Sequence, residues 1–220
     1  MLEALRTDDP DARRRASELL VRAYRAPVLD VISWRWSLEP ADAEDRVQEF
    51  FATALEKSWF DRFDPARGRF RSYVRLLADR FMGHAAESAA RLKRGGGHAA
   101  VSLDDLGDVL PDAEADRRFR DAWVRSVFEL ALAALRSEAT GAGREVHLAL
   151  FEDYDLASAE RPTYAELGAR YRLGESQVIN HLAWARRRFR HHVLATLRAL
   201  AGSEAEYRAD VRDLLGIEPP

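Results

Sequence analysis

The chain has 220 residues, and its hydrophobic content of 47% is enough to bury a core in one or two domains, which excludes disorder throughout. Lys and Arg number 34 and Asp and Glu number 37, so the formal net charge of −3 excludes a uniformly basic coat. The sequence has no cysteine, which excludes disulfides, thiolate metal sites and thiol nucleophiles. No apolar run approaches the ~20 residues that cross a bilayer, so we expect no membrane insertion and a cytoplasmic location.

Apolar residues recur at three- and four-residue spacing almost everywhere and strand signals are nearly absent, which predicts an all-α fold. A first helix is expected from Asp11 to about Val31, kinked or divided at Pro27. A second helix is expected to begin near Pro40, and a third to follow a turn at residues 63–69. The expected inward faces are Val47, Phe50, Phe51, Ala54 and Leu55 in the second helix, and Phe70, Tyr73, Val74, Leu77 and Phe81 in the third.

Three consecutive glycines at residues 95–97 mark a boundary. The stretch that follows contains no Lys or Arg and predicts an acidic flexible linker; its carboxylates are Asp104, Asp105, Asp108, Asp112, Glu114 and Asp116. We therefore expect two helical domains, at 1–96 and 117–200, joined by a linker at 97–116 and followed by a C-terminal tail helix at 201–220. Asp210 and Asp213 of that tail are expected to be exposed and distant from the linker.

The second helical block contains a predicted helix-turn-helix. Residues 163–171 form its first helix, 172–174 its turn and 175–200 its second helix, and Thr163 with Glu166 forms a capping box. Gln and Asn can pair with adenine edges, and Arg with guanine or phosphate. The candidate DNA-contacting residues on the outer face of the second helix are Gln177, Asn180, His181, Trp184, Arg187 and Arg188.

Charge is segregated along the chain despite its small total. No Asp or Glu lies between Asp64 and Asp79, or between Glu175 and Glu204, and both stretches are rich in arginine. Two basic surfaces, one in each block, are typical of a protein that binds the phosphate backbone, although solvated arginine-rich helices give the same pattern.

Three motifs in order resemble those of bacterial RNA polymerase sigma factors of the extracytoplasmic-function group, over about residues 8–215. Asp42-Ala-Glu-Asp-Arg-Val-Gln-Glu-Phe-Phe51 resembles the helix that docks on the clamp helices of the polymerase β′ subunit. Asp64-Pro-Ala-Arg-Gly-Arg-Phe-Arg-Ser-Tyr73 resembles the stretch that leads into the promoter-melting helix. The segment from Pro162 to Arg190 resembles the helix-turn-helix that reads the minus-thirty-five element.

The resemblance implies a promoter-specificity factor that catalyses nothing itself and needs no cofactor or metal. Its implied partners are core RNA polymerase, through the β′ clamp helices and the β flap, promoter DNA, and an anti-sigma factor as an optional further partner. The implied polymerase-binding residues are Asp45, Gln48 and Glu49, on a mostly acidic outer stripe. The implied DNA-binding residues of the first domain are Arg71, Arg75, Phe81, Arg91, Lys93 and Arg94.

The chain departs from the family at residues 83–90, where an Asn and several basic residues are usual but absent here. Two alternatives therefore stay open: a polymerase-independent helix-turn-helix regulator, and a degenerate sigma-like adaptor. Enzymatic interpretations find little support, because residues 95–97 lack the Lys and Ser or Thr of a phosphate loop and the six histidines are scattered. The linker carboxylates are a candidate mask for the basic face at 186–190, and the sequence leaves the role of Trp34 and Trp36 open.

Overall fold

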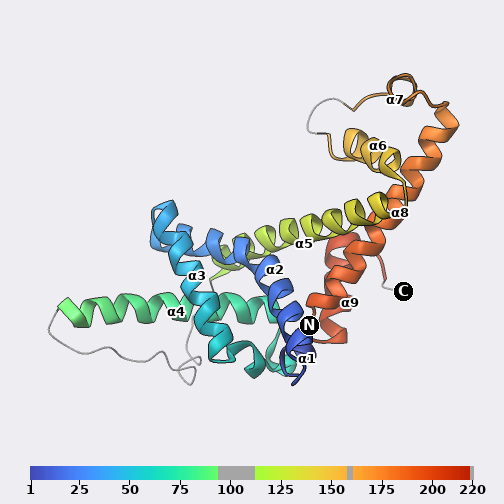
Figure 1. Ribbon diagram of the computed structural model, residues 1–220. Coiled ribbons are helices and arrows are strands. Elements are labelled where there is room, and N and C mark those ends of the chain that lie inside the picture. The colour runs from blue at the N-terminus through green and yellow to red at the C-terminus, as the bar shows by residue number, and fades with distance from the viewer. Residues whose placement is uncertain (94–111, 158–160, 219–220) are drawn as a thin grey trace. The chain divides into compact units, whose positions relative to one another are not determined.

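The computed structural model describes residues 1–93, 112–157 and 161–218, with only the helical backbone of 88–93. Helices α1 to α9 and two short 3-10 helices make up the regular structure of these residues, and no strand occurs among them (Figure 1). This confirms the all-α prediction. The chain divides into two compact units, Met1–Ser126 with Arg198–Pro220 and, separately, Val127–Leu197. We call them the first and the second unit and describe each by itself.

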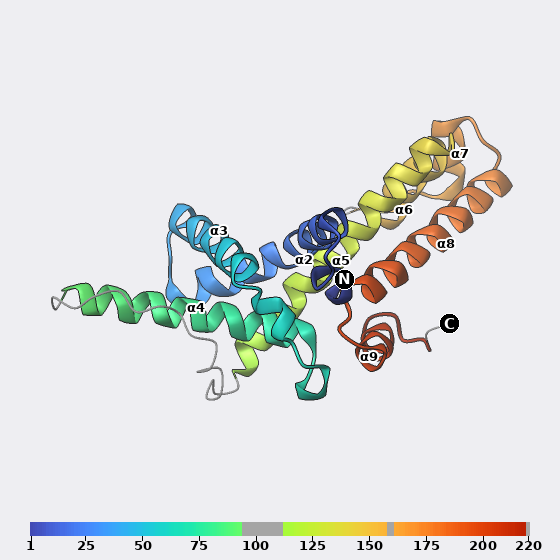
Figure 2. The same cartoon turned by 60° about the horizontal axis from the view of Figure 1, so that its bottom comes forward.

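The first unit contains the four α-helices α1 to α4 of the N-terminal block and the C-terminal helix α9 (Figures 1 and 2). In chain order its elements are α1 (Leu2–Leu5), α2 (Pro10–Trp36), α3 (Pro40–Glu56), the 3-10 helices η1 (Trp59–Arg62) and η2 (Pro65–Arg67), α4 (Phe70–Lys93) and α9 (Glu204–Leu215). Residues 113–126 of α5 (Ala113–Gly141) and residues 198–200 of α8 (Glu175–Leu200) also belong to it.

Helix α2 is longer than the sequence predicts. It continues through Pro27 to Trp36, so of the two predicted effects of Pro27, division of the helix is wrong and a kink stays a prediction. The physical reason is burial: Pro27 lies in the core between the buried residues Tyr24 and Val31, so packing on both sides of the proline offsets the lost backbone hydrogen bond. The predicted start of α3 at Pro40 is confirmed, with proline in the first turn where its missing N–H has no helical partner.

Aromatic side chains form much of the core of the first unit. The Phe50 ring packs edge-on against Phe60, with centroids 6.4 Å apart, and Phe60 packs against Phe70 at 6.2 Å. Tyr24 joins this network through an edge contact with Phe70 at 5.6 Å and a stacked contact with Phe119 at 6.3 Å. The predicted inward faces of α3 and α4 are buried except for Leu55 and Tyr73, which are half-buried. Helical periodicity therefore predicted which faces point inward.

The second unit contains the remainder of α5 and α8, together with α6 (Glu145–Asp155) and α7 (Tyr164–Tyr171). Its apolar core draws on all four helices. The fully buried members are Leu135, Leu150, Phe151, Leu167, Val178, Leu182 and Ala185.

Most of the predicted linker lies outside the described residues, because it covers 97–116 and the description resumes at 112. Its last residues differ from the expectation, since α5 begins at Ala113 and places Glu114 and Asp116 in its first turn. Acidic residues are favoured there by the partial positive charge of a helix N-terminus. Among the described residues, no helix is both long and apolar enough to cross a membrane.

Candidate nucleic-acid interface

A three-residue turn joins α7 to α8. Thr163 caps α7, and its hydroxyl oxygen accepts from the N–H of Glu166 at 3.2 Å while the Glu166 carboxylate accepts from the N–H of Thr163 at 2.7 Å. This confirms the predicted capping box. Arg172 follows α7 in the left-handed conformation, with φ of 57°. At the start of α8, the side-chain oxygen of Gln177 accepts from the N–H of Gly174 at 2.9 Å, so a side chain predicted to read bases also closes the turn.

The N-terminal half of α8 presents polar side chains to solvent. Gln177, Asn180 and Arg187 are exposed, as the sequence predicts for the outer face. Between them lies Ile179, an apolar residue with 49% of its surface exposed. Ile179 is not among the DNA contacts that the sequence predicts. Asn180 is thus a polar side chain beside an exposed apolar one, a combination that suits the edge and methyl group of a base pair.

Two other predicted contact residues of α8 are held by neighbours within the second unit. His181 stacks on His147 with ring centroids 3.8 Å apart, and Trp184 meets His147 edge-on at 5.2 Å. The Arg144 guanidinium lies 5.2 Å from the centre of the Trp184 ring. Partial burial and the nearby Arg144 charge lower the pKa of both histidines, which favours neutral rings at neutral pH. His147 and Arg144 escaped the sequence prediction because no local pattern links them to α8.

Arg188, which is also predicted to contact DNA, is bonded to a residue of the second unit. Its Nε donates to Glu138 of α5 at 3.0 Å, and the same carboxylate lies 2.7 Å from the His192 ring nitrogen. Desolvation acts to raise the pKa of Glu138, but the hydrogen bonds from Arg188 and His192 outweigh it, so the pKa is lowered. Arg188 therefore ties α8 to α5, which leaves Arg187 as the more accessible of the two arginines.

Asp104, Asp105 and Asp108 of the predicted linker mask lie outside the described residues. Arg186 pairs with Asp155 of α6, so its anionic partner comes from within the second unit. The described linker carboxylates instead meet arginines of the first unit. These pairs are Asp112 with Arg35, Asp116 with Arg75, and Glu114 with Arg118.

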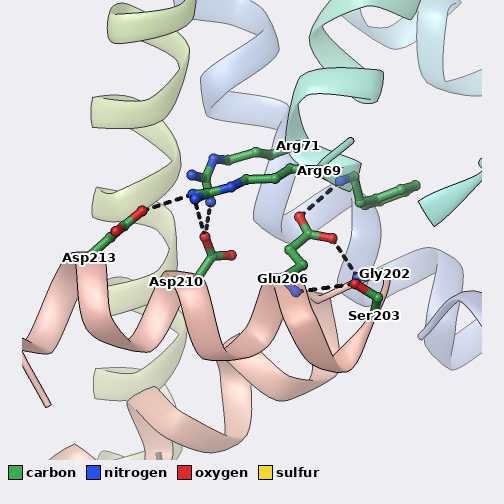
Figure 3. Close-up of polar contacts among 8 residues, drawn as sticks. Arg69, Arg71, Gly202, Ser203, Glu206, Asp210 and Asp213 are labelled. Carbon is green, nitrogen blue, oxygen red and sulfur yellow. Dashed lines mark hydrogen bonds and ion pairs between the residues drawn. The ribbon is translucent and has the colours of Figure 1, made fainter. Parts of the chain in front are cut away.

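Two arginines of α4 that were predicted to contact DNA are buried. Arg71 is 7% exposed and pairs with Asp210 of α9, and its guanidinium lies 4.9 Å from the centre of the Trp123 ring. Arg75 is 3% exposed and pairs with Asp79 one turn along α4. The prediction of an open basic surface at these residues is corrected, because α5 and α9 cover them. Figure 3 shows the contacts of α9 with the start of α4.

The remaining predicted contacts of α4 divide into two groups. Phe81 is 4% exposed and its ring packs edge-on against Phe50 at 5.8 Å, so it belongs to the core and does not face solvent as a stacking platform would. Arg91 and Lys93 lie in α4 beyond the residues whose side chains are described, and Arg94 lies outside the described residues altogether. The exposure of these three side chains stays a prediction.

The outer face of α3 is exposed and acidic. Asp45, Gln48 and Glu49 all face solvent, on the side opposite the buried Val47 and Phe50. Glu49 pairs with Arg46 at 2.6 Å on the helix surface, a contact that contributes little stability when both partners are exposed. The charge of this face would suit a basic partner.

Trp34 and Trp36 occupy the last turn of α2, each beside an arginine. The Arg118 guanidinium lies 5.0 Å from the centre of the Trp34 ring, and that of Arg35 lies 5.6 Å from Trp36. Trp36 and Arg35 also line a cavity of 430 Å³ with residues of α4. The two tryptophans thus differ in surroundings, as their two-residue spacing in one helix requires.

No group of three or more metal-ligating side chains occurs in residues 1–93, 112–157 and 161–218. Comparison with protein families, curated proteins and solved structures found no match to the chain.

Proposed function

We propose that the chain is a promoter-specificity subunit of bacterial RNA polymerase, of the kind its sequence motifs resemble. In this proposal α7 and α8 form a helix-turn-helix that contacts upstream promoter DNA, and the outer face of α3 docks on the β′ clamp helices. The chain performs no catalysis in this role and acts by positioning the polymerase on DNA.

The observation that carries the proposal is the exposed start of α8. Gln177 and Asn180 lie in its first two turns, directly after the turn from α7, and Arg187 lies two turns further along the helix. The first turns of a recognition helix enter the major groove deepest, while later arginines reach the phosphate backbone. The buried contacts of Leu167 with the α8 core support α7 as the helix that positions α8.

The acidic face of α3 supports the second half of the proposal. Asp45, Gln48 and Glu49 carry negative or neutral charge on an exposed surface, which is unfavourable for DNA and favourable for a basic protein partner. A regulator that acts without polymerase has no evident use for this face.

The experiment is co-purification of the full chain with core polymerase, followed by run-off transcription from a library of promoter sequences. The proposal predicts a stable complex and transcripts that depend on the chain. Failure to bind core polymerase would contradict it.

A second candidate is favoured by one observation, the burial of Arg71, Arg75 and Phe81, which removes three expected DNA contacts of the first unit. A polymerase-independent regulator needs none of these contacts, and a sigma-like adaptor needs only the docking face. The same experiment separates them. The regulator does not co-purify with core polymerase, and the adaptor co-purifies with it without supporting run-off transcripts.

A further inference from the structure

Helix α9 places three carboxylates on the first turn of α4. The Glu206 carboxylate accepts from the N–H of Phe70, the first residue of α4, at 2.8 Å, and from the N–H of Gly202 at 2.8 Å. Asp210 pairs with Arg71 and lies 3.1 Å from Arg69 (Figure 3). Asp210 is only 1% exposed, so the expectation that this carboxylate is exposed is wrong.

Asp213 completes the contact, because its carboxylate lies 2.9 Å from the same nitrogen of Arg69 (Figure 3). Asp213 itself is exposed, as the sequence predicts. Two arginines and a backbone N–H at a helix N-terminus thus hold anionic oxygens on the side that α9 covers. Phosphate oxygens are recognised by the same combination of guanidinium groups and helix N-terminal N–H groups.

The arginines of this region also share a cavity. Arg69, Arg71, Arg75 and Arg120 line a space of 230 Å³, in which Asp116 is the one carboxylate among the lining residues. Without the carboxylates of α9, the local charge is therefore dominated by guanidinium groups. This is a second observation, independent of the α9 contacts, that the region suits an anion.

Desolvation makes it unfavourable to keep the Glu206 and Asp210 carboxylates of α9 ionised beside α4. Burial raises the pKa of Asp210 against the attraction of Arg71, and it raises the pKa of Glu206 against the hydrogen bonds from the N–H groups of Gly202 and Phe70. The apolar anchor of α9 is small, with Tyr207 and Val211 as its buried hydrophobic residues. A segment held by costly buried charge and a small apolar contact opens at a lower free energy than a core helix does.

We propose that α9 is an internal substitute for DNA phosphate, which covers an anion-binding surface made by Arg69, Arg71 and the N-terminus of α4 and is displaced when DNA phosphate takes its place. This inference rests on the proposed function, because that function makes DNA the ligand. It adds to the proposed function a DNA-binding surface in the first unit that α9 regulates. When α9 is displaced, Arg71 can contact DNA, as the sequence predicts.

The test uses the full chain, free of polymerase, and a short DNA duplex of arbitrary sequence at low salt. Asp210→Asn with Asp213→Asn weakens the α9 contact and keeps the side-chain shapes. If α9 covers the surface in about 90% of molecules, its release tightens the apparent Kd for DNA about tenfold. The matched control is Asp8→Asn with Asp121→Asn, which changes the charge equally at exposed residues of the first unit and is expected to change Kd by about twofold at most.

Two further measurements keep the test independent of variant folding. In the wild-type chain, DNA should accelerate hydrogen exchange of the amides in 204–215, because α9 is displaced. Arg69→Gln with Arg71→Gln, added to the Asp210→Asn and Asp213→Asn variant, should abolish its gain in affinity. Equal affinities of the α9 variant and its control, or unchanged exchange of α9 at saturating DNA, would overturn the proposal. Loss of polymerase binding would instead contradict the proposed function and leave these results standing.

Discussion

A Cβ atom on Gly168 would lie 2.7 Å from the backbone oxygen of Leu173, a distance too short for any side chain at this position. The N–H of Leu173 also donates to the carbonyl of Gly168 at 2.8 Å. The turn between α7 and α8 is therefore folded tightly against α7, and its path depends on the absence of a side chain at residue 168. This contact, with the packing of Leu167 against Val178 and Leu182, orients the exposed start of α8.

Gly168→Ala should destabilise the second unit by about 1–3 kcal/mol, because the backbone of the turn must move to admit the methyl group. Hydrogen exchange of the α7 and α8 amides measures this loss. Gly141→Ala is the control, since a Cβ there has no heavy atom within 4 Å. A Gly168→Ala chain as well protected as the control would show that the turn can relax.

Asn180→Ala should relax the DNA sequence preference by about 1–3 kcal/mol at particular base pairs. Arg187→Ala should weaken binding to all sequences alike and reduce the salt dependence by about one phosphate contact. Selection from randomised sites and salt titrations measure the two effects. The opposite assignment would contradict the proposed orientation of α8. Arg188→Ala is a poorer probe of phosphate contact, because Arg188 is paired with Glu138.

Asp45→Arg combined with Glu49→Arg should abolish assembly with core polymerase without unfolding the chain, because both side chains are exposed. Charge reversal at a buried intermolecular ion pair typically costs about 2–5 kcal/mol of binding free energy. Pull-down with core polymerase and circular dichroism measure assembly and fold. Asp8→Arg with Asp121→Arg carries the same change in charge elsewhere and should assemble normally. Wild-type assembly of the Asp45 and Glu49 variant would exclude α3 as the docking face.

Asp153 of α6 is held by two side chains of α7. The Tyr171 hydroxyl donates to its carboxylate at 2.8 Å and Arg170 pairs with it at 2.7 Å; the hydrogen bond from Tyr171 is the main cause of a lowered pKa of Asp153. A lowered pKa in the folded state adds stability above the usual carboxyl range, and that stability is lost as pH falls through the lowered value.

Asp153→Asn should therefore destabilise the second unit by about 1 kcal/mol at neutral pH, and the difference from wild type should shrink in acid. Tyr171→Phe should reproduce most of this pattern, because it removes the main donor. Hydrogen exchange of the α7 amides at several pH values measures both. A constant difference across the acid range would exclude the ionised Asp153 as its source.

The sequence by itself determined the all-α class of the fold and the inward faces of α3 and α4. The capping box of Thr163 and Glu166, the start of α3 at Pro40 and the buried Val47 and Phe50 follow from spacings of three or four residues, and such spacings bring side chains together within a single helix. The exposure of Asp45 and Asn180 follows from the same periodicity, because each lies opposite a buried stripe.

Only the tertiary structure decided which charged residues remain accessible. Arg71 and Asp210 are 139 residues apart, and Arg188 and Glu138 are 50 apart, so no local pattern reveals these pairs. Periodicity shows that a side chain lies on the polar face of its helix, but whether a distant helix covers that face depends on the summed packing of the whole unit. For this reason the sequence predicts Arg71 and Arg75 as open surface, whereas the fold holds them in buried ion pairs.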